Sequence, residues 1–236
     1  DVLGSRGLEM CIRDSAYIGR GAAYLYLKDT VRALENFDQA IRTNRENPNG
    51  YYQRGTLLLQ KEEYARAEAD FDMSIRCDST FLPPYFNRAV VYSNTNRPMQ
   101  ALADFDRVLQ LDSTNSFTYF NRAILRTQIG DYNRALDDFD RVALYSPGNV
   151  QVYYLRAMLK TRLGDLEGAE RDYTRAIELY PDFANAYLNR SALRYALHNP
   201  KGAKRDEEIA QRKIAAYKSH LKDSTYSVSY THLRAH

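Results

Sequence analysis

The chain repeats itself at a fixed interval, and this feature restricts its fold more than any other. The string YFNRA occurs at 85–89 and again at 119–123, and the string DFDRV occurs at 104–108 and again at 138–142. Both offsets are 34 residues. A period of this length indicates one supersecondary unit, copied along the chain, that buries its apolar face against the next copy.

Windows of 34 residues align six copies of one pattern, at 14–47, 48–81, 82–115, 116–149, 150–183 and 184–217. Position 4 is always tyrosine: Tyr17, Tyr51, Tyr85, Tyr119, Tyr153 and Tyr187. Position 8 is always small: Gly21, Gly55, Ala89, Ala123, Ala157 and Ser191. Position 20 is always alanine: Ala33, Ala67, Ala101, Ala135, Ala169 and Ala203. Position 24 is aromatic in five windows (Phe37, Phe71, Phe105, Phe139 and Tyr173) and is Glu207 in the sixth.

Each window predicts two helices joined by a turn. Positions 4, 8 and 11 share one face of a first helix, and positions 17, 20, 24, 27 and 28 share one face of a second helix. The strings GDY at 130–132 and GDL at 164–166 predict a glycine that ends the first helix and an aspartate that caps the second. Pro147 and Pro181 predict the end of the second helix in their windows. Small residues at positions 8 and 20 let the two helices approach closely, and the aromatic at position 24 fills the space that is left.

This pattern resembles the tetratricopeptide repeat, a helix–turn–helix unit with an aromatic at position 4, small residues at 8 and 20, and an aromatic at 24. The resemblance covers residues 14–217. It implies an all-α fold, a right-handed α-solenoid of six helix pairs. The chain departs from the family pattern at Pro98 and Pro200, which predict helix starts at position 17. It departs again at Glu207 and Gln211, polar residues that are typical of a terminal repeat.

The amino-acid sequences of the two chain ends indicate an origin different from that of the repeats. The residues EMCIRDS at 9–15 can be encoded by a nucleotide string, and the reverse complement of that nucleotide string encodes VSYTHL at 228–233. That string resembles the transposon adaptor used for sequencing libraries, so we expect residues 1–15 and 228–236 to be adaptor-derived and to pack poorly. The array itself is expected over 16–217, with the end of a capping helix and a tail over 218–227. Because the first window has ordinary core residues, we also expect further repeats upstream.

Arginine at position 7 and aspartate at position 23 recur in matched register. The arginines are Arg20, Arg54, Arg88, Arg122, Arg156 and Arg190, and the acidic partners are Asp70, Asp104, Asp138, Asp172 and Asp206, with Asn36 in the first window. One interpretation is a row of arginines that binds an anionic ligand. We favour structural ion pairs between Arg54, Arg88, Arg122, Arg156 and Arg190 and the five aspartates, because a recurring charge of opposite sign offers a bidentate partner for each guanidinium.

Positions 2, 6, 9 and 13 form one stripe on the first helix, which lines the concave face in the family that the chain resembles. Position 6 is an amide four times, at Gln53, Asn87, Asn121 and Asn189. Position 9 adds Thr56, Val90, Ile124 and Met158. These eight residues are our predicted peptide-binding site. A similar asparagine ladder lines the superhelix of O-linked N-acetylglucosamine transferase, and the four amides are the residues that match it.

Two other sets of positions on the first helix bear on binding. The apolar residues at positions 5 and 10 lie on the flanks of the stripe, and we interpret them as core between repeats. A clamp for a C-terminal carboxylate, found in some co-chaperones of this family, needs lysine at positions 2 and 5. No window has lysine at either position, so the sequence predicts no such clamp.

Composition limits the class of function. Basic and acidic residues number 33 and 30 and are evenly mixed, which argues against nucleic acid as a partner. No apolar run approaches the roughly 18 residues of a membrane helix. Two cysteines and four histidines show no metal-ligand spacing, and no nucleophile motif or phosphate loop occurs. We therefore expect a non-catalytic scaffold that binds proteins or peptides and needs no cofactor. The alternative is a substrate-docking arm of a larger enzyme or signalling protein.

Overall fold

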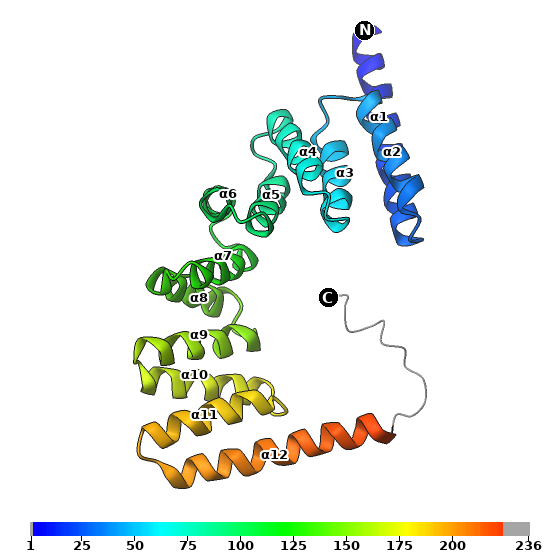
Figure 1. Cartoon of the computed structure of the whole chain (residues 1–236). Helices are drawn as coiled ribbons and strands as arrows, with labels where there is room; N and C mark the ends of the chain where they lie inside the picture. Colours follow the sequence, from blue (N-terminus) through cyan, green and yellow to red (C-terminus); the bar gives the residue numbers. More distant parts are fainter. Residues whose placement is uncertain (1, 224–236) are drawn as a thin grey trace. The chain divides into compact units, whose positions relative to one another are not determined.

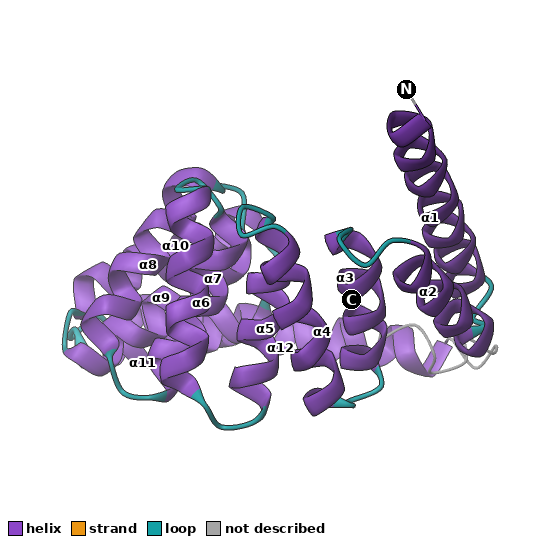
Figure 2. Ribbon diagram, turned by 90° about the horizontal axis from the view of Figure 1, so that it is seen from above, coloured by secondary structure: helices purple, strands orange, loops and turns teal. Residues whose placement is uncertain are grey.

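The computed structural model describes the backbone of residues 2–223 and the side chains of residues 9, 10 and 12–218. The predicted adaptor segment 228–236 and part of the predicted tail lie outside the described residues. The described backbone forms twelve α-helices and no strand (Figures 1 and 2), as the all-α prediction requires. Their bounds are α1 Val2–Tyr26, α2 Thr30–Thr43, α3 Pro48–Gln60, α4 Tyr64–Cys77, α5 Leu82–Asn94, α6 Pro98–Leu111, α7 Ser116–Gln128, α8 Tyr132–Tyr145, α9 Val150–Leu163, α10 Leu166–Leu179, α11 Ala184–Ala196 and α12 Pro200–Asp223.

The helices are grouped in two compact units, residues 1–125 and residues 126–236, whose boundary falls within α7. In the first unit, consecutive helices pack as the pairs α1 with α2, α3 with α4, and α5 with α6. Here the first helices of neighbouring repeats also meet, α1 with α3 and α3 with α5. In the second unit the pairs are α9 with α10 and α11 with α12, and α10 packs against α11.

Close approach within each pair depends on the small residues at positions 8 and 20. All six alanines at position 20 are 0% exposed. In the second repeat the ring of Phe71 occupies the space that a side chain at Gly55 would need, since a Cβ there would lie 2.9 Å from Cε1 of Phe71. The aromatic at position 24 therefore fills the gap between the two helices.

The core is continuous from one repeat to the next within the first unit. Ala33 and Phe37 of the first repeat pack with Leu57 of the second. Ala67 and Phe71 of the second repeat pack with Val91 of the third. Because position 10 of one repeat closes the pocket left by positions 20 and 24 of the repeat before it, no repeat can bury its apolar surface alone.

The turn between the two helices has the same backbone conformation in every repeat. Position 15 has a positive φ in all six: Lys28 (61°), Glu62 (60°), Asn96 (57°), Gly130 (84°), Gly164 (86°) and His198 (57°). Glycine occurs at only two of these positions, so the sequence revealed the left-handed turn in two repeats of six. In the other four repeats a residue with a side chain adopts this left-handed conformation, which has a steric cost for L-residues.

The predicted caps are partly right. Asp165 caps α10 by accepting a hydrogen bond from the backbone N–H of Gly168 at 2.9 Å. Asp131 makes no such bond to α8 and instead lies 3.5 Å from Arg134, so the predicted cap at Asp131 is wrong. Pro98 and Pro200 begin α6 and α12 as predicted.

The expectation of poor packing at the start of the chain is wrong at one residue. Residues 9, 10, 12 and 13 are exposed, but Asp14 is fully buried within α1. Its carboxylate accepts a hydrogen bond from Nδ2 of Asn47 at 3.1 Å. Asn47 is also the N-cap of α3, so Asp14 holds the chain that enters the second repeat.

Candidate functional site

The arginine at position 7 forms a bidentate pair with the aspartate at position 23 of its own repeat. Nε and Nη2 of Arg54 lie 2.8 and 2.6 Å from the two oxygens of Asp70. Arg88 binds Asp104 in the same way at 2.8 and 2.7 Å. The second unit repeats this geometry in the pairs Arg156–Asp172 and Arg190–Asp206. The fork of the guanidinium matches the carboxylate, which makes these strong, directional contacts.

The same arginines reach back to the preceding repeat, a contact that the sequence reasoning missed. Nη1 of Arg54 donates to Asp38 at 2.7 Å, and Nη1 of Arg88 donates to Asp72 at 2.6 Å. Both aspartates occupy position 25. The pairs Arg122–Asp106 and Arg156–Asp140 follow the same rule. The signal was present in the string DFD, whose first aspartate binds its own repeat and whose second binds the next.

Two windows vary this scheme. In the first, Nε of Arg20 donates to the amide oxygen of Asn36, which stands where the other repeats have aspartate. In the sixth, Nη1 of Arg190 donates at 2.9 Å to the hydroxyl of Thr174, which stands where the others have the second aspartate. In both windows the contact joins the same repeat positions as in the other windows, although the partner is neutral.

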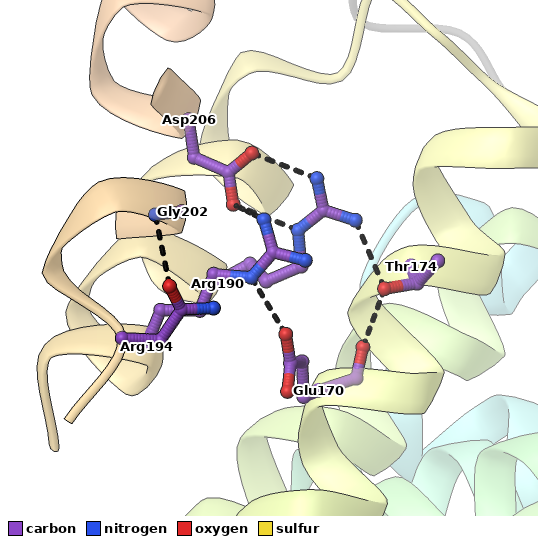
Figure 3. A network of polar contacts seen from close by, with 7 residues as sticks. Glu170, Thr174, Arg190, Arg194, Gly202 and Asp206 are labelled. Atoms are coloured by element: carbon purple, nitrogen blue, oxygen red, sulfur yellow. Dashed lines mark hydrogen bonds and ion pairs between the residues drawn. The ribbon is translucent and has the colours of Figure 1, made fainter. Parts of the chain in front are cut away.

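In the second unit the residue at position 11 places a cation beside each buried aspartate of position 23. Arg126 lies 2.7 Å from Asp138, Lys160 lies 2.8 Å from Asp172, and Arg194 lies 2.9 Å from Asp206. Figure 3 shows the last of these networks, in which Arg194 also binds Glu170 at 2.6 Å. In the first unit position 11 is Tyr24, Leu58 and Tyr92, so Asp70 and Asp104 have no cation from this position.

The electrostatics of Asp104 follow mainly from its burial. Burial raises the pKa of its carboxyl above the ordinary value, and the hydrogen bond from Arg88 opposes that rise. The guanidinium of Arg88 also lies over the rings of Tyr85 and Tyr92, with its central carbon 5.7 Å from each centroid. The arginine is thus held by two acids and two rings, and its own pKa is raised: burial lowers it, and the two carboxylates outweigh that effect.

Three of the four amides at position 6, the residue before each arginine, form a hydrogen bond within their own unit. Nδ2 of Asn87 donates to the hydroxyl of Thr56 at 3.0 Å, and that hydroxyl donates to the carbonyl of Tyr52. Nδ2 of Asn121 donates to the carbonyl of Phe117 at 2.8 Å. An asparagine has two N–H donors and one acceptor, so these single bonds orient the amide and leave it capacity for a ligand.

The stripe at positions 2, 6, 9 and 13, which we call the first-helix face, is exposed or half-buried and almost without charge. Not one of its 24 residues is buried, and Arg162 is the one charged residue among them. Ten of the others are amides: Asn49, Gln53, Gln60, Asn87, Asn94, Asn121, Gln128, Gln151, Asn185 and Asn189. In a chain that is 27% charged, this is a chemically distinct surface.

Two depressions interrupt the first-helix face, one in each unit. The first has a volume of about 210 Å³ and includes Asn87 with the rings of Tyr52, Phe86 and Phe117. The second has a volume of about 350 Å³ and brings Met158 and Asn189 together. Gln53, Thr56, Val90, Asn121 and Ile124, the other predicted binding residues, line neither depression and stand on the open face.

The interpretation of position 5 as core needs correction. Tyr52 and Phe86 pack on the position 24 rings, with centroids 6.4 Å from Phe71 and 5.5 Å from Phe105 respectively. Their other sides are open, because both line the first depression. Position 10 matches its interpretation, since Leu57 and Val91 are 1% and 0% exposed.

Among residues 9, 10 and 12–218, no group of three histidine, cysteine or acidic side chains is placed to hold a metal ion. Among the helices of residues 2–223, none has the length and apolar character that crossing a bilayer requires. The paired helices, the buried ion pairs and the exposed amide face define a helical repeat protein.

Family models identify this class directly. Three models for the tetratricopeptide repeat match residues 18–80, 82–115 and 150–183. The chain belongs to the tetratricopeptide repeat family. No curated protein matches the sequence.

Solved structures with the same fold share little sequence with this chain. PilF of Pseudomonas aeruginosa has a TM-score of 0.72 at 15% identity, over 90% of this chain and 99% of the other. MamA of Desulfovibrio magneticus RS-1 has a TM-score of 0.63 at 17% identity, over 76% and 97%. YrrB, described as a TPR protein with an unusual peptide-binding site, has a TM-score of 0.62 at 22% identity, over 72% and 88%. At these identities the likeness concerns the fold alone.

Proposed function

We propose that the chain is a non-catalytic scaffold whose first-helix face binds extended segments of partner proteins. The observation that carries the proposal is the recurrence of partly exposed amides at position 6 on an otherwise uncharged surface. Membership of the tetratricopeptide repeat family supports it, and so does the peptide-binding site attributed to YrrB, a protein of the same fold.

The amides suit a peptide backbone better than a particular side chain. Asn87 and Asn121 each have one N–H engaged within the protein, which leaves one N–H and the side-chain oxygen. That pair matches the C=O and N–H of an extended backbone. Packed helices lie about 8–10 Å apart, and an extended strand advances about 3.3 Å per residue. Successive amides would therefore meet the bound segment at about every third residue.

Binding through these amides should be weak and tolerant of sequence. A hydrogen bond contributes roughly 0.5–1.5 kcal/mol after exchange with water, so four amides give modest affinity. The residues at position 9 (Thr56, Val90, Ile124 and Met158) lie beside the amides on the same stripe, and they would supply apolar contact between the hydrogen bonds.

The test is selection from a random twelve-residue peptide library, followed by affinity measurement on the recovered peptides. We expect Asn87→Ala/Asn121→Ala to stay folded, because both side chains are partly exposed, and to lose about tenfold in affinity. The matched control is Gln39→Ala/Gln100→Ala, which removes two exposed amides from the second helices of the same unit. Equal affinities for both double variants and the parent chain would show that the binding face lies elsewhere.

A further inference from the structure

The depression of about 210 Å³ lies on the first-helix face between α3, α5 and the start of α7, and all of its lining residues belong to the first unit. Its walls are the rings of Tyr52, Phe86 and Phe117, with Leu82 and Pro83 beside them. Phe117 stacks on Phe86 with ring centroids 5.0 Å apart. It is nevertheless 64% exposed, so one side of its ring is open to solvent.

The size of the depression selects the kind of occupant. An apolar cavity of about 150 Å³ holds a benzene ring, and pockets for whole small molecules begin at about 300 Å³. A volume of about 210 Å³ therefore suits one aromatic or branched aliphatic side chain, which would reach it from a segment bound across the face.

The chemistry of the lining excludes a charged occupant. No acidic or basic side chain lines the depression, and its polar members are the amides Asn87 and Asn115 and the residue Thr118. A charge placed among three aromatic walls would lose its hydration without gaining a partner. Asn87 lies in the lining and can bind the backbone of the segment that delivers the side chain.

Thr118 gives a second, independent observation at the same place. Its side chain is fully buried, and its hydroxyl oxygen is one of three buried side-chain polar atoms in the described chain that lack a hydrogen-bond partner. A buried polar group without a partner destabilises the free protein. Threonine at position 118 is thus not the residue that would give the highest stability, and such departures are typical of functional sites.

We infer that this depression seats an apolar side chain of an otherwise uncharged, extended segment, which makes the partner a protein with an aromatic or branched aliphatic anchor residue. The inference rests on the proposed function, because it assumes that the first-helix face binds extended segments. It adds the chemistry of the partner and the place where specificity is set.

The experiment is a double-mutant cycle on the full chain, with peptides recovered from the random twelve-residue library as probes. We expect the recovered peptides to share one Phe, Leu, Ile or Val and to be poor in charged residues near it. In the parent chain, replacing that anchor with serine should reduce affinity about tenfold. In Phe117→Ala, the same change in the peptide should have little further effect, because the two changes remove the same contact.

The control is Met99→Ala, which removes an apolar side chain that is 72% exposed on α6, outside the first-helix face. It should keep the full tenfold response to loss of the anchor. If peptides bind through Asn87 and Asn121 but show no coupling to Phe117, this inference is overturned and the proposed function stands. If the parent chain selects no peptides, both fail together.

Discussion

Arg88 shows how much of one repeat depends on a single side chain. Its guanidinium donates twice to Asp104, once to Asp72, and lies over two tyrosine rings. Asp104 has a side chain that is only 8% exposed, so loss of the arginine leaves a buried acid. We predict that Arg88→Ala lowers the free energy of unfolding by about 3 kcal/mol at neutral pH. Arg88→Lys should recover only part of this, because lysine cannot form the bidentate fork.

The pH dependence of this loss distinguishes an ion pair from simple loss of packing. The pKa of Asp104 is raised in the folded protein, mainly by burial. The stabilising contribution of a group with a raised pKa is complete below its unfolded pKa, about 3.9, and is lost as pH rises through the folded pKa. Removing Arg88 removes the interaction that lowers this pKa, so the acid can be buried in its neutral form over a wider range. Urea unfolding should show a smaller effect of Arg88→Ala at about pH 4 than at pH 7, and an equal effect would contradict the assignment.

Thr118 offers a substitution that is expected to stabilise the chain, whereas the substitution of Arg88 destabilises it. Its hydroxyl is buried and has no hydrogen-bond partner in the described chain. Replacing it with valine keeps the shape and removes a desolvated polar atom, which costs roughly 1–3 kcal/mol when left without a partner. We therefore predict that Thr118→Val raises the free energy of unfolding by about 1 kcal/mol. Denaturant unfolding beside the parent chain measures this, and a loss of stability would mean that the hydroxyl is hydrogen-bonded in solution.

At the scale of elements, the turn between paired helices imposes one backbone conformation on six different residues. Glu62 adopts a φ of 60° there and Gly164 a φ of 86°. A left-handed conformation costs an L-residue roughly 1–2 kcal/mol, and glycine avoids that cost. We predict that Glu62→Gly stabilises the chain by about 1 kcal/mol and that Gly164→Ala destabilises it by a similar amount. Nothing lies within 4 Å of a Cβ added at Gly164, so a steric clash would not explain the second result.

Thermal unfolding of the two variants beside the parent chain provides the measurement. Shifts of opposite sign are expected, because one substitution removes left-handed strain and the other introduces it. Two shifts in the same direction would mean that the turn is not limited by its left-handed residue.

At the same scale, the sequence predicted the helices well and their contacts only partly. The period located both helices of every repeat, since positions 8, 20 and 24 are determined by packing geometry that recurs with the unit. The bidentate partner of Arg88 was recoverable because position 23 repeats. The contact with Asp72 crosses to another repeat, and although the second aspartate of DFD recurs, the pattern within one window does not show which repeat that aspartate binds.

The candidate site was less predictable for a related physical reason. Exposed side chains such as Asn87 and Phe117 are not constrained by packing, so their partners depend on local rotamers and not on the repeat. To predict the depression beside Phe86, one would also need to know which side of this half-buried ring stays open. The sequence therefore predicted the identity of the face but neither the internal hydrogen bonds of its amides nor its depressions.

For the molecule as a whole, charge is separated from the face that we propose to bind partners. The chain has 33 basic and 30 acidic residues, yet the first-helix face has Arg162 as its one charged residue. Salt screens interactions between exposed charges, with a Debye length of about 10 Å at 0.1 M and about 3 Å at 1 M. Binding through amides and an apolar anchor involves no such interaction.

We therefore predict that affinity for the selected peptides changes by less than about twofold between low and high salt, a range over which interactions between exposed charges are strongly screened. Fluorescence polarisation at 50 mM and 500 mM sodium chloride measures this directly, with the peptides as recovered from the library, charged residues included, as probes. Arg162→Gln should behave like the parent chain in both buffers, because binding through amides and an apolar anchor does not involve its charge. A fall of tenfold or more in high salt would place binding on a charged surface of the chain and not on the first-helix face.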